Sequence, residues 1–149
     1  MTGVQTCALP ISFRDAVEAL VKTVAPEPLR EDFIRIPAAR ALGRYGDQRG
    51  IDVLAKVVSD KDADAERAAR QKGVRLACAK ALSGIFRLTG VAPSNEVFEV
   101  LKKNLKDGDV DIEFNCAEAL GNATLQNPAR LDVSKVRRIE RETVTSEDP

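Results

Sequence analysis

Residues 34–43 read IRIPAARALG, and the same ten-residue pattern returns as VRLACAKALS at 74–83 and as IEFNCAEALG at 112–121. The ninth residue of each copy is a leucine, and these leucines are separated by 40 and then 38 residues: Leu42, Leu82 and Leu120. A period of this length is typical of helical arrays, in which each unit stacks on its neighbours and buries a continuous core. The repetition therefore predicts an all-α protein, an α-solenoid or superhelical stack of about three helix pairs.

The apolar and small residues of each copy lie on one face of a helix, and we call these helices A-type. Bulky aliphatic residues lie eight positions apart, and alanine or cysteine occupies the positions between them. Small residues let neighbouring helices approach closely, while the aliphatic residues fill the seam between layers. The bulky positions are Ile34, Val74 and Ile112 with the three leucines, and the small positions are Ala38, Cys78, Cys116, Ala41, Ala81 and Ala119.

The A-type helices are expected at about 31–45, 74–86 and 111–123. Pro37 lies inside the first of them, so that helix should either start late, near residue 36, or kink at the proline. The polar stretch 59–73 is expected to be a connector that contains no more than a helical turn.

A second, B-type pattern lies between these helices, at about 13–24, 51–58 and 95–105, with a weaker copy at 133–141. Aligning its leucines places an acid in one column and a lysine four residues later in another. That order favours intrahelical pairing, worth roughly 0.2–0.5 kcal/mol per pair. The same residues are the best candidate contact surface, and simple pairing within each helix is the alternative. They are Glu18, Lys22, Asp52, Lys56, Glu99 and Lys103.

These repeats resemble HEAT repeats of the bacterial subtype called PBS-lyase-like. That family's pattern is an acid or Asn, two residues, Val/Ile-Arg, two residues, and Ala-Ala-x-Ala-Leu-Gly. Residues 31–43 match it well. The second copy has Gln71 for the acid and Ser83 for the glycine, and the third has Glu113 for the arginine. The resemblance covers about residues 13–125, and it implies A helices outside and B helices lining a concave side.

Composition narrows the possible functions. Lys+Arg and Asp+Glu are both 23, so the net charge is zero, whereas a dedicated nucleic-acid surface normally brings a basic excess. The chain has no His, and so it lacks the usual near-neutral acid/base and the commonest metal ligand. No apolar run approaches the roughly 20 residues of a membrane span. We therefore expect no catalytic residue, no metal and no cofactor.

Three weaker patterns have structural alternatives. Cys78 and Cys116 share a column and could be a redox or metal pair, but a buried substitute for alanine is favoured. The acids from Asp107 to Asp111, with Glu118, faintly resemble a calcium loop, but helix capping is favoured. The basic residues of 61–75 are interleaved with acids, which favours a solvated connector over a nucleic-acid surface.

Residues 1–12, MTGVQTCALPIS, resemble the translation of a sequencing adapter read from a bacterial GTG start codon. On this interpretation the native N-terminus is absent and the chain is an N-terminally truncated, metagenomic fragment. The expected organisation is an artefact at 1–12, a HEAT-like domain at 13–141 and a frayed tail at 142–149. The domain divides into a half repeat at 13–25 and pairs at 31–58, 74–105 and 109–141.

The sequence thus favours a non-enzymatic scaffold that binds another protein or another domain of the same parent chain. Two alternatives remain open at this stage: an accessory or chromophore-lyase-type domain of an enzyme, and a nucleic-acid-binding HEAT-like domain, which the charge balance disfavours. A membrane partner is not expected. The location is undetermined, with the cytoplasm slightly favoured.

Overall fold

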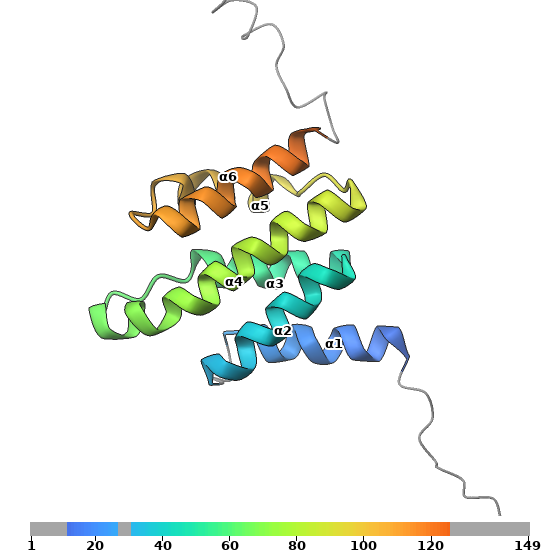
Figure 1. The fold of residues 1–149 in the computed structure, drawn as a ribbon, viewed down its shortest axis with the longest axis horizontal. Helices are drawn as coiled ribbons and strands as arrows, with labels where there is room; N and C mark the ends of the chain where they lie inside the picture. Colours follow the sequence, from blue (N-terminus) through green and yellow to red (C-terminus); the bar gives the residue numbers. More distant parts are fainter. Residues whose placement is uncertain (1–11, 27–30, 126–149) are drawn as a thin grey trace, which may run out of the picture.

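The computed structural model describes residues 12–26 and 31–125 (Figure 1). Within these ranges the chain forms α-helices and two short 3₁₀ helices, and no strand. The α-helices are α1 (Phe13–Val24), α2 (Asp32–Tyr45), α3 (Ile51–Ser59), α4 (Ala65–Thr89), α5 (Asn95–Lys103) and α6 (Val110–Leu125). The 3₁₀ helices are η1 (Gln48–Gly50) and η2 (Asn104–Lys106).

The helices form two layers, which we call the A layer (α2, α4 and α6) and the B layer (α1, α3 and α5). In the A layer, α4 packs between α2 and α6, as Figure 1 shows. In the B layer, α3 packs against α1 and α5, while α1, α3 and α5 also contact α2, α4 and α6, respectively. This arrangement confirms the predicted all-α solenoid.

The repeated A-type residues supply much of the core. Leu42 and Leu82 are fully buried, as are Cys78 and Cys116, while Leu120 is partly buried. Ile34 is the exception, because it is 41% exposed although Val74 and Ile112 in its column are fully buried. No A-layer helix precedes α2 in the described part of the chain, so this edge of the stack is uncovered.

The connector expected at 59–73 is wrong, because α4 begins at Ala65 and runs for 25 residues. Asp64 caps the helix: its side chain accepts from the backbone N–H groups of Glu66 and Arg67 at 2.9 and 3.1 Å. One turn later, Glu66 and Arg70 form an i,i+4 ion pair at 2.6 Å. Local capping and pairing therefore extend the A-type helix well beyond the repeat motif.

Of the two alternatives given for the first A-type helix, a late start or a kink at Pro37, the late start is wrong. α2 begins at Asp32 and continues through Pro37. The backbone N–H groups of Ile34 and Arg35 bond to the Glu31 carbonyl, so the first turn is complete before the proline. Pro37 itself is exposed.

Local residues set several of the helix ends. Ser12 and Ser94 cap α1 and α5, each accepting from the backbone N–H three residues on. Gly46 and Gly90 end α2 and α4 with φ of 66° and 65°, a conformation that favours glycine. The predicted helix at 133–141, the adapter-like segment through residue 11 and the tail at 142–149 lie outside the described residues.

Candidate functional site

The six charged residues predicted as a contact surface all lie on B-layer helices, and all are exposed. Glu18 and Lys22 are on α1, Asp52 and Lys56 on α3, and Glu99 and Lys103 on α5. We call this set and the surface between its members the B-layer face.

The expected pairing of each acid with the lysine four residues later does not occur. Glu18 instead pairs with Arg14 at 3.1 Å, and Glu99 pairs with Lys102 at 3.4 Å. Asp52 forms no ion pair with any described residue, and neither do the three lysines of the face. Most charges on this surface are therefore satisfied by solvent and available to a partner.

A groove on this face lies between α1 and α3 and continues past the end of α1. Val21 and Val53 are half-buried in it, and Asp52 and Lys56 lie among the residues that line it. The other four predicted residues are not part of its lining. The structure therefore brings only Asp52 and Lys56 of the predicted set into one concavity, the rest being spread over the face.

Sequence reasoning missed Arg49, which also lines this groove. Asp47 accepts from the Arg49 side chain at 2.9 and 2.8 Å. This bond lowers the pKa of Asp47, against a smaller opposing effect of burial, and raises the pKa of Arg49, with a lesser contribution from Glu18 of α1. The Asp47-x-Arg49 spacing in the turn was the available signal.

The arginine of the repeat motif has a structural role. Arg35 donates to the Val24 carbonyl at 3.3 and 3.2 Å, and Arg75 donates to the Val58 carbonyl at 2.9 Å. Each arginine is buried and satisfies a carbonyl at the C-terminal end of the preceding B-layer helix. Glu113, in the same column of the third copy, instead accepts from the Gly108 N–H at 2.9 Å.

Arg75 also joins the neighbouring repeat. Its guanidinium pairs with Asp107 at 2.5 Å, and the side chains are 6% and 5% exposed. It donates to the Asn104 side-chain oxygen at 3.1 Å as well. This buried cluster ties α4 to the loop before α6, a contact that the sequence did not predict.

The acids that faintly resembled a calcium loop have structural partners. Asp107 is held by Arg75, and Asp109 caps α6 through the N–H groups of Asp111 and Ile112 at 3.1 and 3.2 Å. Among the described residues, no group of three or more Cys, Asp or Glu side chains is placed to hold a metal ion.

The two described cysteines are free thiols with no disulfide between them. Burial raises the pKa of Cys78 to about 12. Burial, with a smaller contribution from Asp107, raises the pKa of Cys116 to about 11. Both thiols therefore stay protonated near neutral pH, which suits the packing role and not a nucleophilic one.

Most of the basic residues of the 61–75 stretch are also paired. Lys61 lies 3.7 Å from Asp107, Lys72 lies 2.5 Å from Asp109, and Arg70 pairs with Glu66. The bond with Lys72 lowers the pKa of Asp109, although slight burial acts the other way. This pairing leaves little free positive charge here for a nucleic acid.

Over the described ranges, no helix has the length and apolar character that crossing a membrane requires. A comparison with protein families matches residues 34–60, from α2 through the end of α3, to the PBS lyase HEAT-like repeat. A search of curated proteins finds no match. Proteins with HEAT repeats are generally non-catalytic and usually mediate protein interactions. The match bears out the resemblance over residues 34–60, and the helix stack is that of an all-α repeat solenoid.

Proposed function

We propose that this protein is a non-catalytic scaffold module that binds another protein, or another domain of a longer parent chain, through the B-layer face. The observation that carries the proposal is the groove between α1 and α3. Its half-buried valines, Val21 and Val53, are flanked by Asp52 and Lys56, whose charges are unpaired within residues 12–26 and 31–125. An apolar centre with a polar rim is the usual anatomy of a protein interface.

The repeats support this role by holding the B layer rigid. Leu54 and Leu101 of α3 and α5 are fully buried, and buried arginines of α2 and α4 fasten the ends of α1 and α3. A preordered surface loses little conformational entropy on binding. We therefore expect a partner to dock on a preformed face without refolding it.

The charges on the face would contribute specificity and association rate more than affinity. On each B-layer helix the acid of the face precedes its lysine by four residues, so a complementary partner carries the opposite order. A partner with a uniform charge of either sign would meet repulsion from part of the face.

The test starts from ligands selected against the whole chain from a peptide display library. Their affinity is then measured for Asp52→Lys/Lys56→Asp, which exchanges two groove charges without changing the net charge. The matched control is Glu66→Arg/Arg70→Glu, an equivalent exchange on an exposed A-layer helix end. We expect roughly tenfold weaker binding for the groove variant and little change for the control.

Selected ligands that bind both variants equally well would overturn the proposal. Failure to select any ligand from several libraries would count against it as well. Thermal unfolding of the two variants checks that each remains folded, so that a loss of affinity reports on the surface.

A further inference from the structure

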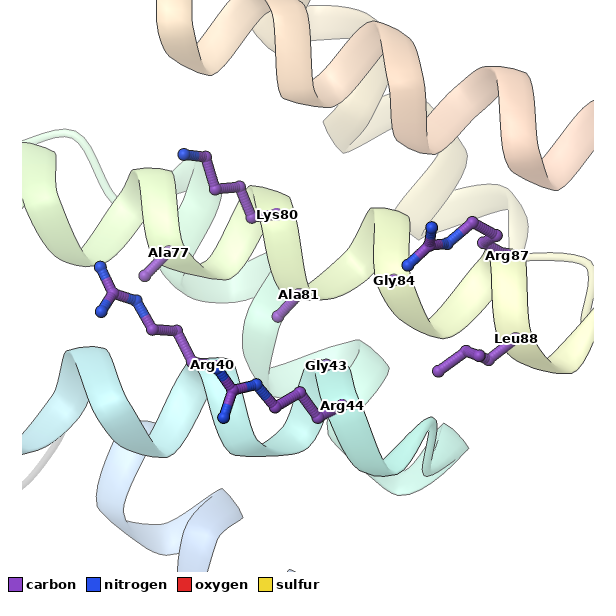
Figure 2. A pocket seen from close by; sticks show the side chains of 9 residues that line it. All are labelled: Arg40, Gly43, Arg44, Ala77, Lys80, Ala81, Gly84, Arg87 and Leu88. Atoms are coloured by element: carbon purple, nitrogen blue, oxygen red, sulfur yellow. The ribbon is translucent and has the colours of Figure 1, made fainter.

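The A layer carries a second hollow, between α2 and α4, on different helices from the B-layer groove (Figure 2). Its volume is about 380 Å³. Arg40 and Arg44 line it from α2, and Lys80 and Arg87 line it from α4. In Figure 2 the Arg40 side chain extends toward α4, whereas the Lys80 side chain extends to the side of α4 that faces away from α2. None of these four cations forms an ion pair or hydrogen bond with another residue of the described ranges.

The helices that form this hollow are free of acids over most of their length. No Asp or Glu occurs from residue 33 to 46, nor from residue 67 to 89. The whole chain nevertheless has zero net charge, so its charges are segregated. The hollow therefore concentrates positive potential, which low-dielectric walls strengthen.

Small residues bring the two walls together. Gly43 lies so close to α4 that a Cβ atom built on it would be 2.7 Å from the Ala81 Cα. A Cβ atom on Gly84 would be 3.1 Å from the Gly43 carbonyl oxygen. This close approach places cations from two helices around one floor. The apolar side chain of Leu88 lies beside the floor, which consists of small residues: Gly43, Ala77, Ala81 and Gly84.

We call the hollow between α2 and α4 the basic groove. We propose that it binds an extended acidic segment of a partner protein, with carboxylates on alternate residues. Side chains on one side of an extended strand repeat at about 7 Å, and Arg40 and Arg44 are one helical turn apart, about 6 Å. Arginine binds carboxylates with two parallel hydrogen bonds, which adds geometric specificity to charge. The alanine floor and Leu88 accommodate small or apolar side chains between the acids.

The charge distribution favours a peptide over a nucleic acid duplex. A duplex needs many phosphate contacts spread over a broad basic surface. Here four cations line one hollow between α2 and α4. On the next A-layer helix, Asp111 and Glu118 are exposed, and the Glu118 carboxylate accepts from the Ser83 hydroxyl of α4 at 2.8 Å. A duplex that extended over α6 would meet those carboxylates, whereas a segment between α2 and α4 has α4 between itself and α6.

The test uses the full chain and a fluorescein-labelled peptide in which glutamate alternates with alanine. Binding is followed by fluorescence anisotropy at low salt and near 0.15 M salt, where the Debye length is about 8 Å. We expect saturable binding that weakens as salt rises. The same peptide with glutamine in place of glutamate should not bind.

Arg40→Gln/Arg87→Gln removes one cation from each wall and should lower the affinity for the peptide by roughly tenfold or more. The matched control, Arg67→Gln/Arg70→Gln, also removes two charges, from the exposed start of α4. Arg70, the nearer of the two, is 10 positions from Lys80, about 15 Å along the helix, which is about two Debye lengths near 0.15 M salt. At that salt the control should change affinity by less than about twofold.

Two results would overturn the proposal. One is an equal loss of peptide affinity in both double variants, which would show attraction to net charge and not to the groove. The other is tighter binding of a labelled DNA duplex than of the peptide at the same salt, which would assign the groove to nucleic acid. Asp52→Lys/Lys56→Asp should leave peptide binding unchanged, so this test is separate from that of the B-layer face.

Discussion

Gly43 and Gly121 occupy the same place in the first and third repeats, yet alanine should have opposite effects at the two positions. Both glycines are inside α-helices, α2 and α6. Alanine is favoured over glycine in a helix interior by about 1 kcal/mol. Helix propensity alone therefore predicts that both substitutions stabilise the protein.

Packing reverses this expectation at Gly43. Its new Cβ atom would lie 2.7 Å from the Ala81 Cα and 3.3 Å from the Ala81 carbonyl oxygen. Backbone cannot rotate away as a side chain can, so α2 and α4 would have to separate by about 0.7 Å to restore ordinary contact at 3.4 Å. Overpacking of this kind costs about 1–3 kcal/mol, and the gain in propensity offsets about 1 kcal/mol, so we expect Gly43→Ala to be destabilising by up to about 2 kcal/mol.

Gly121 has no described atom within 4 Å of the added Cβ. Gly121→Ala should therefore stabilise the protein by about 0.5–1 kcal/mol. Urea unfolding followed by far-UV circular dichroism gives both free energies, provided that the m-value stays constant. A Gly43→Ala variant that is more stable than the parent chain by about 1 kcal/mol, as helix propensity alone predicts, would refute the close packing of α2 on α4.

Three further substitutions test the core, the buried ion pair and the pH dependence of stability. Leu82→Ala removes a fully buried side chain and should cost about 2–5 kcal/mol by urea unfolding, whereas Leu88→Ala, at a residue 58% exposed on the same helix, should cost less than about 1 kcal/mol. Arg75→Leu leaves the buried Asp107 with only the weaker contact to Lys61 at 3.7 Å and should cost about 3–5 kcal/mol, and Arg75→Leu/Asp107→Leu should recover much of that loss in a double-mutant cycle. The pKa of Asp109 is lowered in the folded protein, so its contribution to stability is present above the ordinary pKa of 3.8 and is lost as pH falls through the lowered pKa. Asp109→Asn should therefore reduce the pH dependence of the unfolding free energy below about pH 4.

The repeat period predicted the layers of helices because equivalent residues pack in the same way in each repeat. Leu42 and Leu82 must fill the seam between stacked helices, so the pattern recurs and can be read without a structure. Helix ends were predictable for a similar reason: Ser94 and Gly90 act through hydrogen bonds and backbone angles that are local. Local chemistry and repetition together account for most of the fold.

The predictions that failed concern residues whose role depends on a distant neighbour or on competing local signals. Asp64 is one of several acids in a polar stretch, and the sequence does not show which of them caps a helix. Ile34 is aliphatic like the equivalent residues of the other repeats, but it lies on the open edge of the stack and is therefore exposed. The basic groove escaped notice because its cations come from two helices about 40 residues apart, which only packing at Gly43 brings together.

The most direct test of the central claim, that the B-layer face receives the partner, is site-specific photo-crosslinking to a library-selected ligand. Lys56 on α3 and, as a control, Arg67 on α4 are each replaced by p-benzoylphenylalanine; both positions are exposed. The account predicts that the ligand crosslinks from position 56 and not from position 67. A ligand that binds the chain but crosslinks only from position 67 would contradict it.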